Sequence, residues 1–135
     1  MAKKNYYNDL LPGEPIILSG CYAEFSVAED QPLTDAETRG ILDQAGEPLY
    51  LIIDLTEVSL SLNDIIVGAN IGARSNVPLW KHPNLKEVIF VVSNATVKLA
   101  IKGLDSMPFG NIQAKAFGTQ KEALDYCRTR IAEGY

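Results

Sequence analysis

Polar side chains gather near the middle of the chain, between an apolar run and a predicted helix. Residues 49–74 read LYLIIDLTEVSLSLNDIIVGANIGAR. The residues of this segment that could bind a ligand or partner are Asp54, Thr56, Ser59, Ser61, Asn63 and Asp64. A helix start offers free N–H groups and a positive dipole end, so it can hold an anion. Asp64 already places negative charge there, which disfavours phosphate.

The same residue types have an alternative role in capping the helix. Ser61 and Asp64 have capping-box spacing, and Asp54 ends the preceding apolar run. A second polar pair, Ser93–Asn94, follows the apolar residues 88–92 at the end of the strand predicted at 85–93. Because the carboxyl ends of parallel strands share one edge, we expect both loops to lie there, where ligands bind in such sheets. The loops therefore predict either a partner or ligand surface, or helix capping alone, and capping is required in every helix.

Other residues suited to catalysis or metal binding are few. His82 could act as a general acid or base, but no orienting partner or nucleophile is indicated, so we prefer a turn histidine between prolines. Cys21 and Cys127 form no CxxC pair, and one histidine does not make a usual zinc site. The chain has no phosphate loop, HExxH or GxSxG motif. We expect no catalytic activity, no metal and no cofactor.

The length and net charge of the chain exclude several classes of protein. A chain of 135 residues is the size of one domain and can bury a substantial core. Its net charge of −5 argues against sequence-independent nucleic-acid binding. The first residues lack the apolar run of a secretory signal, and no uncharged run, including 65–73, is long enough to cross a bilayer. We expect a cytoplasmic protein that does not span the membrane.

The element pattern predicts an α/β fold. Residues 1–14 are expected to be a loosely held arm, and 15–135 a single domain. Strands are predicted at 16–18, 22–27, 48–54, 85–93 and 111–118, and helices at 34–46, 62–74, 94–107 and 119–134. Thr34 with Glu37, and Thr119 with Glu122, have capping-box spacing. The order β-β-α-β-α-β-α-β-α predicts a mostly parallel central sheet covered by helices, with one antiparallel edge.

Small residues recur on the predicted helix 62–74. Gly68 and Gly72 lie four residues apart, and Val67 and Ile71 make the side beside them apolar. Tight packing inside the domain is one explanation. A homodimer contact, or a lid over an apolar pocket, is the alternative.

Three segments, together with the element order, resemble the SpoIIAA-like group of the STAS family, often described as STAS/SEC14-related. They are LIIDLTEVSLSLNDIIVGANIGA (51–73), HPNLKEVIFVVSNATVKLAIKGL (82–104) and IQAKAFGTQKEALDYC (112–127). Relatives that act as anti-sigma-factor antagonists carry a phosphorylated serine at the start of the corresponding helix. This chain has SLND at 61–64, so that position falls on Asn63 or Asp64, and neither accepts a phosphate.

The resemblance implies a non-catalytic regulatory domain that binds an unidentified regulatory protein. Two other functions stay open. One is a module that binds an apolar or lipid-like small molecule under helix 62–74, and the other is an enzyme using His82. Whether Asp64 stands in for a phosphoserine, and whether Ser59 or Ser61 is modified, also stay open.

Overall fold

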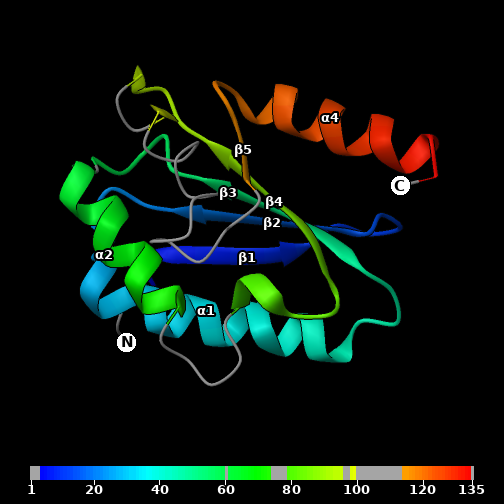
Figure 1. Cartoon of the computed structure of the whole chain (residues 1–135), viewed down its shortest axis with the longest axis horizontal. Helices are drawn as coiled ribbons and strands as arrows, with labels where there is room; N and C mark the ends of the chain where they lie inside the picture. Colours follow the sequence, from blue (N-terminus) through cyan, green and yellow to red (C-terminus); the bar gives the residue numbers. More distant parts are fainter. Residues whose placement is uncertain (1–3, 60, 74–78, 96–97, 100–113, 135) are drawn as a thin grey trace.

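The fold is a five-stranded mixed sheet between helices, described from a computed structural model that covers residues 4–59, 61–73, 79–95, 98–99 and 114–134 (Figure 1). The elements are β1 (Tyr6–Leu10), β2 (Ile16–Cys21), α1 (Val27–Gln44), β3 (Leu49–Asp54), α2 (Leu62–Ala73), a short 3-10 helix η1 (Leu79–Lys81), β4 (Leu85–Val91), β5 (Ala114–Phe117) and α4 (Gln120–Ala132). The strand order is β1-β2-β3-β4-β5, with β1 antiparallel to β2 and the other neighbours parallel. The predicted mixed sheet with one antiparallel edge is confirmed.

The first strand and the first helix lie earlier in the chain than predicted. β1 lies inside residues 1–14, which we had expected to be an arm, and the strand predicted at 22–27 is wrong. There the chain turns, with the Phe25 N–H donating to the Tyr22 carbonyl at 3.0 Å, and enters α1. Of the five residues of β1 (YYNDL) only Tyr6 is buried, and polar contacts with α1 help to hold the strand. Hydrophobic periodicity therefore did not reveal it.

The start of α1 corrects the predicted cap at Thr34. The helix begins at Val27, and Ser26 caps it by accepting the Glu29 N–H at 3.4 Å. Thr34 lies inside the helix, where its hydroxyl accepts from Asn8 Nδ2 at 2.9 Å. α1 also contains Pro32, which has no N–H to donate to the helix. The capping box predicted at the last helix is confirmed, since the Glu122 N–H donates to the Thr119 hydroxyl at 3.2 Å.

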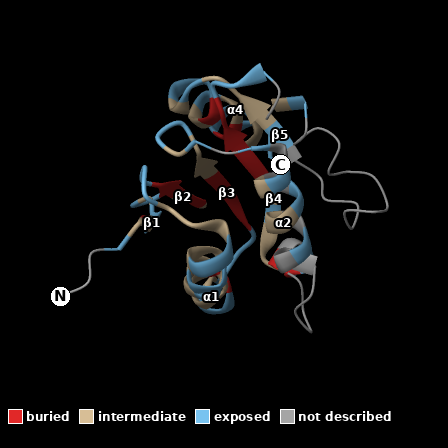
Figure 2. Cartoon of the chain, turned by 90° about the vertical axis from the view of Figure 1, so that its left-hand side faces the viewer, coloured by how far each residue is buried: buried red, intermediate tan, exposed pale blue. Residues whose placement is uncertain are grey.

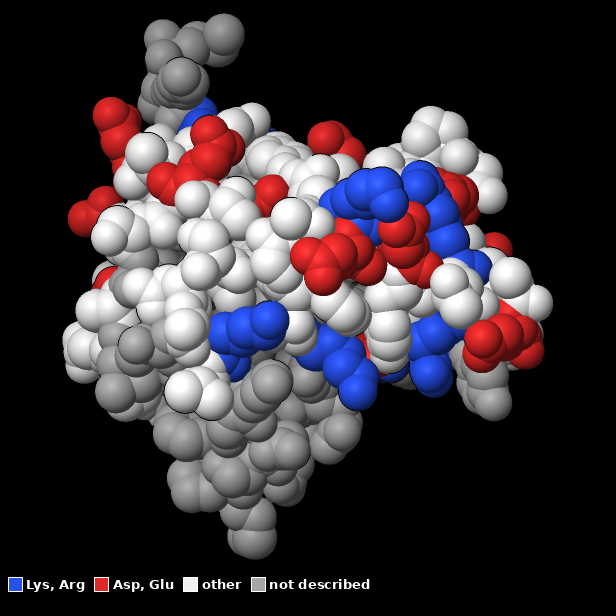
Figure 3. Space-filling view, turned by 90° about the horizontal axis from the view of Figure 1, so that it is seen from above, with Lys and Arg blue, Asp and Glu red and all other residues white. Residues whose placement is uncertain are grey.

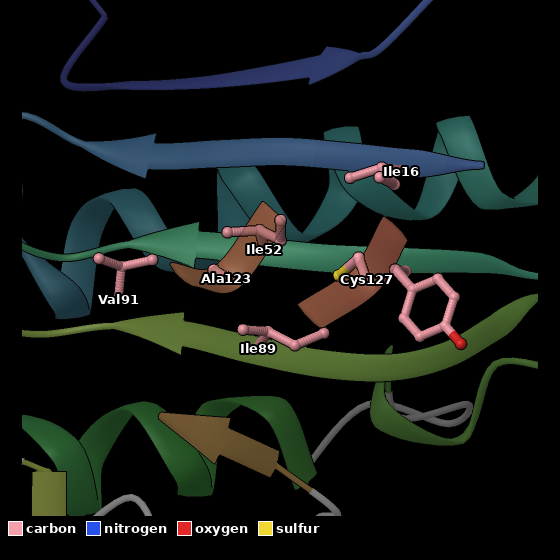
Figure 4. Packing of buried hydrophobic residues seen from close by; sticks show 7 residues of the cluster. Ile16, Ile52, Ile89, Val91, Ala123 and Cys127 are labelled. Carbon is pink, nitrogen blue, oxygen red and sulfur yellow. The ribbon is translucent and has the colours of Figure 1, made fainter. Parts of the chain in front are cut away.

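The core has two layers because alternate residues of each central strand point to opposite faces. Figure 2 shows α1 and α2 on one side of the sheet and α4 on the other. The layer under α4 consists of Ile16, Tyr50, Ile52, Ile89, Val91, Ala123 and Cys127 (Figure 4). The layer on the α1 side consists of Ile17, Leu42, Leu49, Leu51 and Leu79. The central strands are thus buried on both faces, as their continuously apolar sequences predict.

Helix α2 packs against α1 through Gly68. The Gln31 side chain donates to the Gly68 carbonyl at 2.7 Å, and a Cβ on Gly68 would lie 2.8 Å from Gln31 Oε1. Gly68 therefore serves packing between two helices of this chain. For Ile71 and Gly72 only the helical backbone is described, and most of the helix predicted at 94–107 lies outside the described residues.

Candidate functional site

The two predicted polar loops meet at the carboxyl edge of the sheet. Asp54 at the end of β3 is aligned with Val91 at the end of β4, so the segments that follow are neighbours. They surround an open hollow of about 300 Å³, lined by Leu55, Thr56, Glu57, Val58, Ser59, Val92, Ser93 and Asn94. Of the predicted site residues, Thr56, Ser59, Ser93 and Asn94 line this hollow and are exposed.

Asp54 was predicted to belong to a partner or ligand surface, but both of its carboxylate oxygens accept hydrogen bonds from other residues of the chain. Oδ1 accepts the Thr56 N–H at 2.8 Å and the Thr56 hydroxyl at 2.6 Å. Oδ2 accepts from Gln120 Nε2, at the start of α4, at 2.7 Å. Asp54 therefore shapes the loop and ties it to α4, and it is not one of the residues lining the hollow.

The start of α2 has the capping geometry that its spacing predicts. Asp64 Oδ2 accepts the Ser61 N–H at 2.8 Å and the Ser61 hydroxyl at 3.0 Å. In return the Asp64 N–H donates to the Ser61 oxygen at 3.1 Å. The Asp64 carboxylate thus points back at Ser61 and fills the position that an anion at this helix start would need.

A second open hollow, here called the α1–α2 groove, lies beside the first. It measures about 430 Å³ and is lined by Phe25, Ser26, Val27, Ala28, Ser59, Asn63, Asp64 and Val67. Ser59 lines both hollows. Sequence reasoning missed the α1 side of this groove. The signal for it was the capping-box spacing of Ser26 and Glu29, which places a helix start next to Phe25.

Comparison with known proteins identifies the fold. No protein-family model and no curated protein matches the sequence. The chain is similar to the crystal structure of an uncharacterized DUF3478-family protein with a SpoIIAA-like fold from Shewanella loihica PV-4. The TM-score is 0.60 at 17% identity, over 90% of this chain and 91% of that chain. This chain has a SpoIIAA-like fold. The predicted resemblance is confirmed at the level of the fold, which does not itself establish a function.

In this SpoIIAA-like fold His82 lies at the opposite edge of the sheet, before β4. Its buried ring donates from Nε2 to Asp43 Oδ1 at 2.7 Å, and Nδ1 accepts the Asn84 N–H at 3.0 Å. Asn84 Nδ2 in turn donates to the carbonyls of Leu42 and Ala45 at 2.9 and 3.2 Å. Both ring nitrogens are thus engaged in joining the end of α1 to β4. Asp43 is the orienting partner that the sequence did not indicate.

The remaining reactive groups of the SpoIIAA-like fold are buried or dispersed. Burial raises the pKa of the Cys21 and Cys127 thiols to about 12, so neither is a ready nucleophile near neutral pH. Within the described part of the chain, no three His, Cys, Asp or Glu side chains are grouped so that they could hold a metal ion. None of the described helices is long and apolar enough to cross a membrane.

Proposed function

We propose that this chain is a non-catalytic regulatory domain that works by binding a protein partner at the carboxyl edge of its sheet. The contact surface consists of Thr56, Ser59, Ser93 and Asn94 around the 300 Å³ hollow, with Asn63 and Asp64 at the start of α2. The observation that carries this proposal is the meeting of two polar loops around one open, exposed hollow. Asp54 and Ser61 support the surface through bonds inside the chain.

The shape of the surface favours contact with a partner over enclosure of an apolar molecule. Sites for small molecules bury most of the ligand in clefts of about 300–1,000 Å³ with mostly apolar walls. The hollow at the sheet edge is open, and five of its eight lining residues are Thr, Glu, Ser or Asn. A third, smaller hollow between α1 and the sheet measures only about 30 Å³, which is room for about one water.

The residues at the start of α2 indicate whether phosphorylation there could control partner binding. Asn63 is exposed, and the Asp64 carboxylate is held by Ser61, so the family's position for a phosphoserine has no hydroxyl to modify. In our proposal partner binding does not depend on phosphorylation at this position. Asp64→Asn removes one charge from the contact surface, so it should weaken partner binding by about 1 kcal/mol or less, as the loss of one exposed charge does, and should not abolish it.

Affinity capture with matched arginine variants tests the proposal. Ser59→Arg and Ser93→Arg each put a long cation into the proposed surface, whereas Thr129→Arg makes the same kind of change on the exposed side of α4. Each tagged full chain is expressed in its own host, and proteins that co-purify are quantified by mass spectrometry. We expect the two surface variants to lose at least about 80% of a partner that wild type and Thr129→Arg retain, since an Arg at the centre of a contact costs several kcal/mol.

Thermal melting of each variant separates a lost contact from a lost fold. Exposed substitutions usually change the free energy of unfolding by less than about 0.5 kcal/mol. If all three arginine variants capture the same proteins in the same amounts as wild type, the proposed surface is wrong.

A further inference from the structure

Most of the ion pairs between acidic residues and Lys or Arg in the described part of the chain involve α4, whereas several exposed carboxylates elsewhere are unpaired. The pairs involving Lys or Arg are Lys4–Glu37 at 2.8 Å, Lys121–Asp125 at 3.1 Å, Arg128–Glu14 at 2.8 Å and Arg130–Glu87 at 3.6 Å. Figure 3 shows basic and acidic side chains side by side over α4. Glu24, Glu29 and Glu57 are exposed and form no ion pair or side-chain hydrogen bond with any described residue.

These unpaired carboxylates flank the α1–α2 groove. Glu24 precedes and Glu29 follows the four α1-side residues that line the groove, and Glu57 lies two residues before Ser59. The apolar lining is made of Phe25, Val27, Ala28 and Val67. The other half of the lining is polar or charged, namely Ser26, Ser59, Asn63 and Asp64. The exposed Glu24, Glu29 and Glu57, which adjoin the lining residues in the sequence, are here called the acidic edges.

Helix capping does not account for all of this negative charge. Each helix start carries roughly +0.5 of an elementary charge, so α1 and α2 together contribute about +1. The carboxylates at or beside the two helix starts are Glu24, Glu29, Asp30, Glu57 and Asp64. None of the described Lys or Arg residues lines the groove. About four negative charges are thus left without compensation from the helices.

The groove is also held in place before any partner binds. Gln31 of α1 donates to the Gly68 carbonyl of α2, and Gly68 allows the two helices to come close. At the α1 end, Asp30 Oδ2 accepts the Ser26 N–H at 2.8 Å and an N–H of the Asn5 side chain at 3.3 Å. A preorganised groove costs a partner less entropy on binding.

We infer that the α1–α2 groove docks a cationic, apolar segment of the protein partner. This inference rests on the proposed function and names the chemistry of the partner. Apolar side chains of the segment would cover Val27, Ala28 and Val67, and Lys or Arg heads would reach Glu24 and Glu29. The long stems of Lys and Arg can lie along apolar surface while their charged ends stay in water. The acidic edges would speed encounter with such a segment and exclude acidic ones.

A titration with model peptides tests this chemistry directly. The probe is an acetylated, amidated peptide of alternating Lys and Leu, compared with a Glu–Leu and a Lys–Ser peptide of equal length. Binding to the ¹⁵N-labelled full chain is followed by amide chemical shifts at low ionic strength. We expect the Lys–Leu peptide to shift the amides of Val27, Ala28 and Val67, and to bind at least about tenfold more tightly than either control peptide.

Charge-reversal variants test whether the acidic edges are the reason that the Lys–Leu peptide binds. Glu24→Lys with Glu29→Lys should weaken Lys–Leu binding by about tenfold, because each exposed charge contributes up to about 1 kcal/mol. The matched control is Glu47→Lys with Glu133→Lys, which changes the net charge equally at exposed positions outside the groove, and it should change binding less than about twofold. Equal binding of the Glu–Leu peptide, shifts confined to other elements, or equal losses in both double variants would overturn the inference.

The two proposals can fail separately. If the partner captured from the host is lost in Ser93→Arg but retained in Glu24→Lys with Glu29→Lys, the contact surface stands and the cationic segment is wrong. If the partner is lost in the groove variant and retained in Glu47→Lys with Glu133→Lys, the inference is supported.

Discussion

Asp35 offers a stability prediction whose size can be worked from the structure. It lies in α1 and lines the small hollow between α1 and the sheet that Ser19, Cys21 and Thr38 also line. Burial raises the pKa of its carboxyl from 3.8 to about 6, and the Gln31 amide and the Arg39 guanidinium oppose that rise only in part. The folded chain therefore binds this proton more tightly than the unfolded chain does. Asp35→Asn removes the titration while nearly keeping the shape of the side chain.

The size and sign follow from linkage. A pKa difference of about two units corresponds to about 3 kcal/mol, at 1.36 kcal/mol per unit. Between about pH 4 and pH 6 the folded state holds more protons, so the contribution of Asp35 to the free energy of unfolding falls as the pH rises. Below this window the carboxyl is neutral in both states and costs nothing, and above it the full cost is present. The stability of Asp35→Asn relative to wild type should rise by about 2 kcal/mol between about pH 4 and about pH 7.

Urea unfolding at several pH values measures this difference. The matched control is Asp9→Asn, at an exposed position of β1, whose stability relative to wild type should stay level over the same range. Comparing each variant with wild type removes the pH dependence of the other carboxyls, such as Glu14 and Glu37, whose pKa values are lowered by Arg128 and Lys4. A difference between Asp35→Asn and wild type that does not change with pH would refute the reasoning.

Two further predictions concern buried groups. At about pH 8 both thiols of the native chain should react with a disulfide reagent at least about 100-fold more slowly than in urea, because burial raises their pKa to about 12 and shields the sulfur; fast labelling of the native chain would contradict this. Asn84→Ala should lower the free energy of unfolding by about 2 kcal/mol, measured by urea unfolding, because it removes two bonds to carbonyls at the end of α1 at about 1 kcal/mol each. A loss under about 0.5 kcal/mol would show that water replaces the Asn84 amide.

The elements that could be predicted are those whose signal is local. β3 and the second half of β4 are runs of apolar residues, and α4 has a capping box followed by an apolar stripe, so each is visible in a short window. β1 is a half-polar edge strand, and what stabilises it is spread along α1. Asn8 Oδ1 accepts from the hydroxyls of Ser19 and Thr38 at 2.5 and 3.1 Å. Such a network joins residues far apart in the chain and leaves no pattern in β1 itself.

The site shows the same division between local and distant contacts. The bonds between Ser61 and Asp64 span three residues and follow from spacing alone. The bond from Gln120 to Asp54 spans 66 residues, and the one between His82 and Asp43 spans 39. The edge to which each loop belongs could be predicted, because parallel strands place their carboxyl ends together. The particular side chains that each loop residue contacts could not be predicted from the sequence.

The crowding of polar residues at this edge does not by itself indicate a function, because parallel strands deliver the chain to helix starts there and every helix start needs acceptors. The residues left over after capping carry the functional argument. Asp54, Ser61 and Asp64 bond inside the chain, whereas Ser59 and Ser93 are exposed and form no side-chain hydrogen bond with the described residues. Arginine at Ser59 or Ser93 should therefore disturb a contact surface without removing a cap. That is why these two serines, and not the more conspicuous Asp54 or Asp64, decide whether the edge binds a partner.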